Sequence, residues 1–385
     1  MIELSRFSHL KGPLGVYVHI PFCLAKCKYC DFCSFPIPPG SVPDAYVDRL
    51  IEDIEDFGSK TGRPEADTIF FGGGTPTLLS VRQWGKIMEQ LSRSFRILPG
   101  TEISTECNPA TADRALFSEL KSLGFNRVSI GMQSANDDEL SLLGRVHRNE
   151  QTVRTVRDAY SAGFREINLD MMFGIPGQTK DSFEHSIRTA CSLPVTHISS
   201  YALQLEPGTP LEAHRNEYVF PDDDQVADMY DALCSCLSEL GYERYEISNF
   251  SIPGHECRHN LKYWTGAPYM GFGISSHSFL DRTRFFQPSD LDAYLTSAAS
   301  YQTEEELTPE RFCDELLVLG LRLSRGVSLS DISRRSGVDA LARYGTQIDT
   351  MRKQGTVDLS EDRLTIQPQY MFISNSILDD LLPDR

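Results

Sequence analysis

The stretch that decides the fold is Tyr17-Val-His-Ile-Pro-Phe-Cys23-Leu-Ala-Lys-Cys27-Lys-Tyr-Cys30, a short apolar run followed by three closely spaced cysteines. The spacing C-x-x-x-C-x-x-C lets three thiolates converge on one soft metal centre. A cubane iron–sulfur cluster held by only three cysteines keeps one iron open to a small molecule. The spacing therefore predicts a 4Fe–4S cluster on Cys23, Cys27 and Cys30.

Zinc and disulfides account less well for the cysteines. A structural zinc ion would need a fourth ligand, which Cys33 or His19 could supply, so this alternative stays open. A disulfide framework fits poorly, because ten cysteines in 385 residues is a low density and no secretory signal precedes them. No stretch has the length of a membrane span. We expect a reducing, cytoplasmic location, with Cys33 beside the cluster but not bound to it.

The charge of the chain narrows its partners. The formal net charge is −17, which repels phosphate backbones and anionic membrane surfaces. Nucleic acid is therefore a poor candidate for a main partner. An acidic small molecule held in a local basic pocket remains compatible with this charge.

Short apolar runs alternate with longer amphipathic stretches, which is typical of βαβ units around a parallel sheet. The predicted strands are Gly15–Ile20, Thr68–Phe71, Glu102–Thr105, Arg127–Met132, Glu166–Met171 and His197–Ala202. The predicted helices lie near Asp44–Phe57, Val81–Ser94, Ala112–Leu123, Glu150–Ala162 and Asp181–Cys191. Six units are too few for a closed eight-fold barrel, so the pattern predicts an α/β fold with an open, partial (β/α)6 TIM-type barrel.

Polar and glycine residues follow the predicted strands, at the end where such barrels carry their chemistry. The second strand runs into Gly72-Gly-Gly-Thr-Pro76, whose glycines allow backbone to approach a ligand closely. Glu106, Gln133 and Asp170 stand at the ends of the next three strands. Each of them taken alone is equally well explained as a cap of the following helix. Together they predict convergent polar groups over the mouth of the barrel.

The cysteine spacing, with Tyr29 before the last cysteine, resembles the signature of radical S-adenosylmethionine (SAM) enzymes, in which SAM chelates the open iron. The strings that start at Tyr17, Gly72 (GGGTPT), Gly131 (GMQS) and Phe173 (FGIPGQT) resemble the family of oxygen-independent coproporphyrinogen III oxidase and its relatives, over roughly residues 15 to 280. The resemblance implies SAM contacts from Tyr17, Tyr29, Gly73, Gly74, Thr75, Glu106, Gln133 and Asp170. It also implies a basic residue after the fourth strand, for which we take Arg148, with Arg145 as the alternative.

This family contains at least two functions. The oxidase carries a substantial leader before its first strand and a cysteine two positions after the third cluster cysteine. Here the first strand is predicted fourteen residues into the chain, and Asp31 and Phe32 follow Cys30. Both departures favour the family's shorter member, a heme chaperone, over radical decarboxylation of coproporphyrinogen III, which stays the alternative. Whether SAM is cleaved is left open, and no catalytic residue is assigned.

A second motif, His259-Asn-Leu-Lys-Tyr-Trp264, resembles a string of that shorter relative. Neutral imidazole is a common axial ligand of heme iron, so His259 is the predicted heme ligand. Tyr263 and Trp264 offer flat apolar faces to a porphyrin, and Arg258 and Lys262 could meet its propionates. The alternative is a structural turn in which His259 is hydrogen-bonded.

The sequence divides into a core (1–245), a connecting segment with the histidine motif (246–305) and a C-terminal region (306–385). In the connecting part, 271–277 is predicted as a loop and 302–308 as a linker. The C-terminal region should form helices at 312–323, 329–336 and 340–354 followed by a β-hairpin, which resembles a winged-helix module used for interaction or for capping the barrel. The expected partners are heme or another porphyrin, a heme-acceptor protein of unknown identity and, if SAM is cleaved, an electron donor; a homodimer is left open.

Overall fold

Six parallel strands form the centre of the molecule. In this computed structural model, which describes residues 2–296 and 301–382, they pair in the order in which they occur along the chain. They are β1 (Leu14–Ile20), β4 (Glu65–Gly73), β5 (Arg96–Cys107), β6 (Arg127–Gln133), β7 (Glu166–Phe173) and β8 (His197–Ala202). This sequential parallel pairing confirms the predicted α/β partial barrel.

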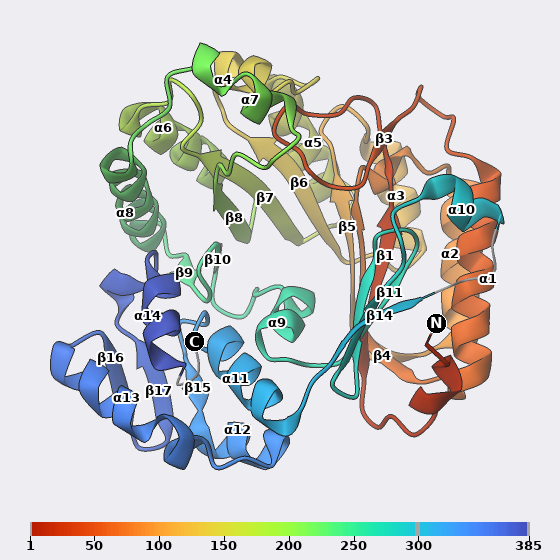
Figure 1. Cartoon of the computed structure of the whole chain (residues 1–385). Coiled ribbons are helices and arrows are strands. Elements are labelled where there is room, and N and C mark those ends of the chain that lie inside the picture. The colour runs from red at the N-terminus through yellow and green to blue at the C-terminus, as the bar shows by residue number, and fades with distance from the viewer. Residues whose placement is uncertain (1, 297–300, 383–385) are drawn as a thin grey trace.

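The helices that follow these strands along the chain cover the outer face of the curved sheet (Figure 1). They are α1 (Asp44–Thr61), α2 (Val81–Ser94), α3 (Arg114–Ser122), α5 (Asn149–Ser161), α6 (Lys180–Cys191) and α8 (Asp223–Glu239). The helix α2 shows why they form: Ser80 and Gln83 make a capping box at its start, and Trp84 and Leu91 on its inner face are fully buried.

The sheet continues beyond the six strands at both edges. After β8 come β10 (Asn249–Ser251) and β9 (Glu243–Arg244). On the other side, β11 (Tyr269–Phe272) runs parallel to β1 and is followed by antiparallel β12 (His277–Leu280), β13 (Thr283–Phe286) and β14 (Gln302–Glu306). The predicted linker at 302–308 is therefore wrong, because most of it is an edge strand. The predicted loop at 271–277 is shorter than expected, because β11 extends into its start and β12 begins at its last residue. The boundary predicted near residue 245 cuts through one continuous sheet.

Several short elements connect these parts. The loop after β1 contains β2 (Phe22–Cys23) and β3 (Phe35–Pro36), and α4 (Asp137–Leu142) and α7 (Pro210–Ala213) lie near it at the top of Figure 1. The remaining ones are α10 (Leu291–Thr296) and the 3₁₀ turns η1 (Leu4–Phe7), η2 (Pro76–Leu78), η3 (Arg215–Glu217) and η4 (Pro368–Tyr370).

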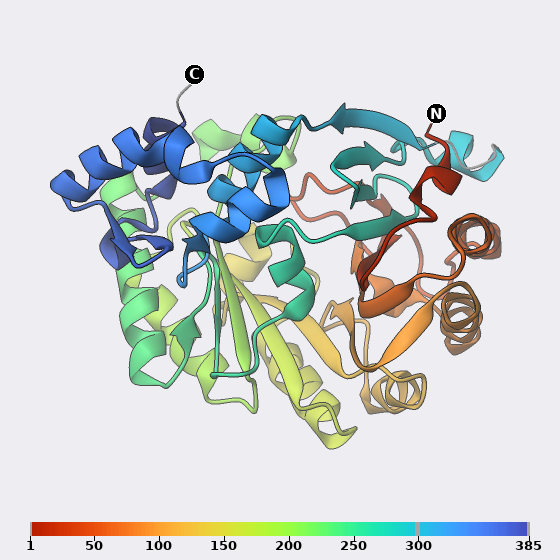
Figure 2. The ribbon, with the colours of Figure 1, turned by 90° about the horizontal axis from the view of Figure 1, so that it is seen from below.

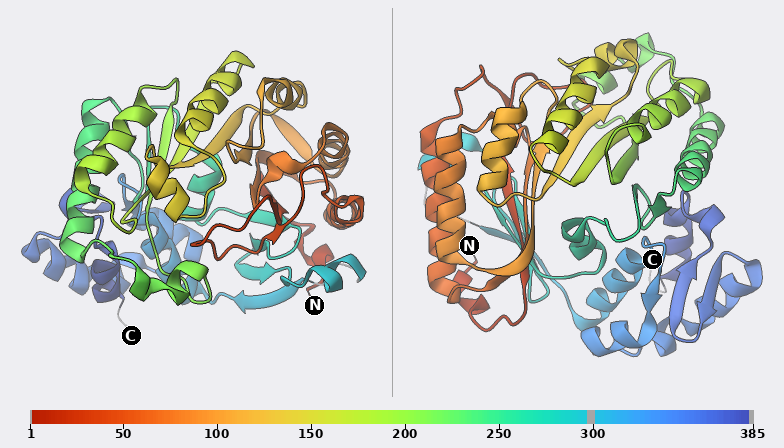
Figure 3. Two further views of the ribbon diagram at one scale, coloured as in Figure 1. Left: turned by 90° about the horizontal axis from the view of Figure 1, so that it is seen from above. Right: turned by 180° about the vertical axis from the view of Figure 1, so that it is seen from behind.

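The barrel is open, and other parts of the chain lie on its concave side. The helix α9 (Arg258–Trp264) lies inside the curve of the sheet, between the strands and the C-terminal elements (Figure 3). Figure 2 shows the C-terminal elements along one side of the molecule, away from the helices of the N-terminal half. This arrangement places the histidine motif between the barrel interior and the C-terminal region.

The C-terminal region has a hydrophobic cluster of its own. It contains α11 (Pro309–Gly320), β15 (Val327–Ser328), α12 (Leu329–Ser336), α13 (Ala340–Gln354), the hairpin strands β16 (Val357–Ser360) and β17 (Arg363–Ile366), and α14 (Ser374–Leu381). The helices predicted at 329–336 and 340–354 have the observed bounds, and the predicted hairpin is present. No helix in the described part of the chain has both the length and the apolar character needed to cross a lipid bilayer.

Candidate functional site

The three motif cysteines lie on one loop at the carboxyl end of the parallel strands. The loop is anchored by backbone hydrogen bonds on both sides: Lys28 N–H donates to the carbonyl of Leu143 (3.0 Å), and Leu211 N–H donates to the carbonyl of Lys28 (2.9 Å). All three cysteines are free thiols, half-buried. The anchored loop fixes the place where the thiols meet a ligand.

The thiols suit a metal cluster better than three separate cysteines. Burial raises the pKa of Cys30 to about 11, with the nearby Cys27 and Cys23 adding to the effect, and burial also raises the pKa of Cys23. A shared metal centre would stabilise the thiolate forms of these cysteines. Two donors already point at them, since the Thr75 hydroxyl lies 3.5 Å from Cys23 Sγ and the Arg145 guanidinium 3.4 Å from Cys27 Sγ. This donor set fits an anionic iron–sulfur cluster.

The candidates for a fourth zinc ligand have other roles. Both ring nitrogens of His19 are engaged, Nδ1 with the Tyr17 hydroxyl (3.0 Å) and Nε2 with the carbonyl of Cys33 (2.9 Å). The Cys33 thiol lies 3.8 Å from the carbonyl of Ser289. His19 therefore serves to hold the loop, which weakens the zinc alternative.

The glycine-rich turn after β4 packs against the start of the cysteine loop. Gly74 N–H donates to the carbonyl of Ile20 (2.9 Å) and Thr75 N–H to that of Phe22 (2.7 Å). Gly73 has a φ of +106°, and a Cβ there would lie 2.3 Å from the ring of His19. A Cβ on Gly74 would lie 2.6 Å from the carbonyl oxygen of Phe22. Only glycine fits these two positions.

Two half-buried carboxyl groups face the space beside this turn. Glu106, at the end of β5, accepts a hydrogen bond from Gly73 N–H (3.0 Å). Burial, together with the nearby Asp170, raises the pKa of Glu106 to about 8. Burial also raises the pKa of Asp170, although this carboxylate accepts hydrogen bonds from Ser129 (2.7 Å) and Asn168 (2.8 Å). The pair is suited to a positively charged ligand, which would favour both ionised forms.

Of the other predicted SAM contacts, Tyr17 lines the same space as these two carboxyl groups. Gly72 lies between Tyr17 and Glu106, since a Cβ there would be 3.1 Å from the Tyr17 ring and 3.0 Å from Glu106 Oε1. Gln133 has a φ of +63° at a bulge that ends β6. Tyr29 packs against the small apolar cluster that contains Leu143.

The structure separates the two candidate arginines. Arg145 donates to the carbonyl of Gly131 (2.9 Å) and reaches Cys27. The side chain of Arg148 is 79% exposed, stands at the start of α5 and pairs with Asp137 (3.6 Å). The turn just before Arg145, at Gly144 (φ +75°), lies against Lys28 of the cysteine loop. The placement of Arg148 in the site does not agree with this geometry, and Arg145 takes its place.

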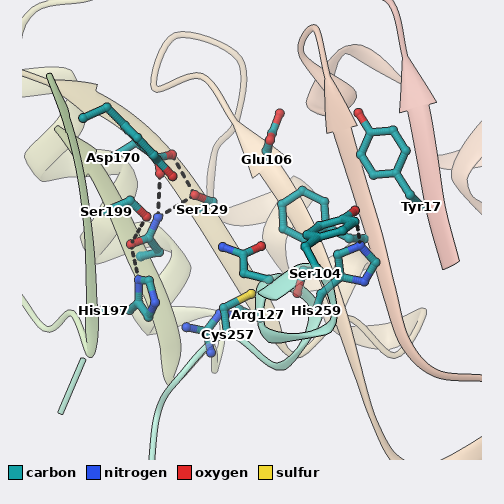
Figure 4. A pocket seen from close by; sticks show the side chains of 15 residues that line it. Tyr17, Ser104, Glu106, Arg127, Ser129, Asp170, His197, Ser199, Cys257 and His259 are labelled. Atoms are coloured by element: carbon teal, nitrogen blue, oxygen red, sulfur yellow. Dashed lines mark hydrogen bonds between the residues drawn. The ribbon is translucent and has the colours of Figure 1, made fainter. Parts of the chain in front are cut away.

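Below the strand ends lies a cavity of about 220 Å³ lined mainly by residues with polar side chains, shown in Figure 4. Glu106 and Asp170 line it from the sheet, together with Ser129 and His197. His259 closes it from α9. Pockets that enclose drug-sized ligands typically measure roughly 300–1,000 Å³. A tetrapyrrole therefore does not fit in this cavity as it stands.

His259 is part of the packing that fixes α9. Its Nδ1 shares a hydrogen bond with the Thr68 hydroxyl (2.9 Å), its Nε2 shares one with the Tyr263 hydroxyl (2.9 Å), and its ring stacks on Phe70. The side chain is buried, and burial lowers its pKa to about 3. The imidazole is neutral, as heme ligation requires, but neither ring nitrogen is free. The geometry thus matches the structural alternative for His259 and not the open axial ligand.

The charges beside His259 also stabilise α9. Lys262 Nζ pairs with Asp67 (2.7 Å), and Arg258 donates to the carbonyl of Gly100 (2.8 Å). Glu102 accepts the backbone N–H groups of Arg258 (3.1 Å) and His259 (2.9 Å) at the start of the helix. These basic groups are used inside the protein, so the expected propionate contacts from Arg258 and Lys262 are not formed by this arrangement.

Some residues of the site were not predicted. Ser129 and Asn168 hold Asp170, and they are register partners on β6 and β7. Side chains alternate between the two faces of a strand, so Asn168, two residues before Asp170, could have been expected on the same face as that carboxylate. Arg127, also missed, is buried between Glu102 and Glu166.

Comparisons with known proteins show the family of this chain. The chain matches the model of the Radical SAM superfamily over residues 17–190 and that of the HemN C-terminal domain over residues 307–372. It is 35% identical to the heme chaperone HemW of Bacillus subtilis (strain 168), covering 96% of this chain and 99% of the relative. It is 33% identical to the heme chaperone HemW of Mycobacterium tuberculosis (strain ATCC 25618 / H37Rv), and this match covers 99% of this chain and 98% of the relative.

A solved structure gives the same fold. The coproporphyrinogen III oxidase HemN from Escherichia coli, described as a radical SAM enzyme, superposes with a TM-score of 0.86 at 23% identity. The match covers 99% of this chain and 92% of that one. At this identity the likeness shows the shared fold. Because relatives that are 33–35% identical match over nearly their whole length, the chain belongs to the radical SAM family that includes these HemW proteins.

Proposed function

We propose that this chain is a heme chaperone, which binds heme and passes it to an acceptor protein. The observation that carries the proposal is the end-to-end match, at 33–35% identity, with relatives that bear this name.

The cofactors of the proposal are a 4Fe–4S cluster and SAM. Cys23, Cys27 and Cys30 would hold the cluster, and its open iron would supply a binding point for SAM. The glycine turn would receive SAM by its backbone amides. Glu106 and Asp170 would face its positive charge, and Arg145 would balance the thiolates.

The parts of the chain have distinct roles in this proposal. Residues 1–245 carry the cluster and SAM, residues 246–305 carry the histidine motif, and residues 306–385 close the barrel or meet partners. The expected partners are heme, a heme-acceptor protein and, if SAM is cleaved, an electron donor, while a homodimer is left open. A cytoplasmic location follows from the need for reduced thiols at the cluster.

Transfer kinetics test the proposal. Heme-loaded protein is mixed with an apo b-type cytochrome, and the heme absorbance of the acceptor is followed over a range of acceptor concentrations. A chaperone gives a transfer rate that rises with acceptor concentration, because the acceptor meets the loaded protein. A rate that stays at the value of heme dissociation into a passive scavenger contradicts the proposal.

A further inference from the structure

The helix α9 has two faces with different surroundings. His259 points into the barrel cavity, while Trp264, at the end of the same helix, lines a separate crevice of about 280 Å³. The opposite wall of this crevice comes from the C-terminal region, with Leu316 of α11 and Ile332 of α12 among its apolar residues. The crevice therefore joins the histidine motif to the C-terminal region.

Positive charge gathers in this crevice, although the chain as a whole carries −17. Arg325, Arg335 and Arg363 line it, and Asp331 is the carboxylate among its lining residues. Arg335 donates to the carbonyls of Thr265 and Gly266 (both 2.7 Å), which fixes the end of α9.

The other two arginines are available to a ligand. Arg363 donates to the carbonyls of Arg325 (3.2 Å) and Gly326 (3.3 Å) through one nitrogen. The guanidinium of Arg325 makes no hydrogen bond or ion pair with any residue that the structure describes. Both side chains are exposed at the rim.

A rigid turn presents Arg325. Gly326 has a φ of +61°, and a Cβ there would lie 2.0 Å from the carbonyl oxygen of Leu364, so the chain must turn at a glycine. Ser324 N–H donates to the carbonyl of Tyr245 (2.9 Å), which ties the turn to the barrel. The position of Arg325 is thus set from both the barrel and the C-terminal region.

We propose that this crevice binds the propionate edge of heme, with Arg325 and Arg363 on the carboxylates and Trp264 against the macrocycle. The proposal rests on the proposed heme-chaperone function. Heme is a flat apolar ring with two carboxylates on one edge, and guanidinium groups bind carboxylates in paired, charge-assisted hydrogen bonds. An aromatic and aliphatic floor with arginines at its rim is complementary to that edge.

The crevice also explains how heme would be released. His259 is engaged on both ring nitrogens and the barrel cavity is too small, so the interior does not receive heme in this conformation. A crevice of about 280 Å³ takes only an edge of the macrocycle. The remainder of heme stays exposed to an acceptor protein.

The test compares two ligands on matched variants. Hemin and its dimethyl ester, which lacks the carboxylate charges, are titrated into the wild-type protein and into Arg325→Gln, followed by heme absorbance. Arg157→Gln, an exposed arginine on α5, is the control. We expect Arg325→Gln to weaken hemin binding about tenfold, in line with the loss of a charge-assisted hydrogen bond. The ester should bind the wild-type protein and Arg325→Gln equally.

The outcomes separate the two proposals. If the wild-type protein binds hemin and Arg325→Gln binds it equally well, the crevice is not the site, while the chaperone function survives. If the ester and hemin bind the wild-type protein alike, the propionate contact is overturned. If the wild-type protein binds neither, the proposed function fails and the crevice proposal fails with it. Because the Arg325 guanidinium makes no hydrogen bond or ion pair within the described residues, its substitution leaves the fold intact.

Discussion

Glu106 gives a pH dependence that follows directly from its burial. Its pKa is raised from 4.5 to about 8, so the folded protein keeps the proton over a range in which the unfolded chain has lost it. The unfolded state then binds fewer protons than the folded state, and stability falls as the pH rises from about 5 to about 8. For one group shifted in this way, the loss between pH 6 and pH 8 is about 2 kcal/mol, since one pKa unit corresponds to about 1.4 kcal/mol.

The perturbation is Glu106→Gln, which keeps an oxygen to accept the hydrogen bond from Gly73 but removes the titration. Free energies of unfolding are measured by urea titration of the SAM-free protein at pH 6 and pH 8. We expect the stability advantage of Glu106→Gln over the wild type to be about 2 kcal/mol larger at pH 8 than at pH 6. Glu119→Gln, an exposed residue of α3, is the control and should show no such difference.

An equal pH dependence in the wild type and in Glu106→Gln would contradict the raised pKa, because Glu106 would then not titrate between the two pH values. The protonation of Glu106 should also affect ligand binding. A cationic ligand favours the ionised carboxylate, so SAM binding in the wild type should strengthen from pH 6 to pH 8, and this gain should be absent in Glu106→Gln.

Three further predictions concern the cluster and the glycine turn. Arg145→Gln should lower the iron and sulfide content per chain after anaerobic reconstitution, because Cys27 loses its charged donor. The control Arg148→Gln should match the wild type, and equal losses in both variants would contradict the assignment of Arg145 to the site. Gly74→Ala should weaken SAM binding, measured by calorimetry, at least about tenfold, because its Cβ would collide with backbone. The control Gly85→Ala, where a Cβ meets open space, should bind SAM as the wild type does. Normal SAM binding by Gly74→Ala as well would show that the collision at Gly74 has no effect on the site. Cys33→Ser should retain the full iron content, and a loss of iron would show that Cys33 is a ligand.

Much of the barrel could be predicted because its elements have clear periodicity. The bounds of α2 and β8 agree with the prediction. The helix α2 has a clear capping box at its start, and β8 is a short run whose first four residues are buried. The strand β5 begins six residues before the predicted start at Glu102, because its first part contains Pro99 and Gly100, which are unusual in strands, and is partly exposed.

The edge of the sheet could not be predicted from local pattern. The strand β14 has the sequence Gln-Thr-Glu-Glu-Glu, which is typical of a linker. It forms because its backbone pairs with β13, and Glu305 meets Arg284 across the pair. Such a strand depends on a partner that the local sequence does not show.

The choice between the arginines and the state of His259 depended on tertiary contacts. Arg145 and Arg148 are separated by two residues, and only their contacts in the fold distinguish them, since Arg145 reaches Cys27 and Arg148 pairs with Asp137 at the surface. The histidine motif pointed to a chemically suitable ligand, but its partners Thr68 and Tyr263 come together only in the fold.

Heme binding and oxidase activity can be compared directly in one preparation. The protein is reconstituted with its cluster without oxygen and incubated with SAM, a reductant and coproporphyrinogen III, and a parallel portion is titrated with hemin. We expect stoichiometric heme binding and no protoporphyrinogen among the porphyrin products. Formation of protoporphyrinogen that disappears in Cys27→Ser would contradict the chaperone function and would make the chain an oxidase.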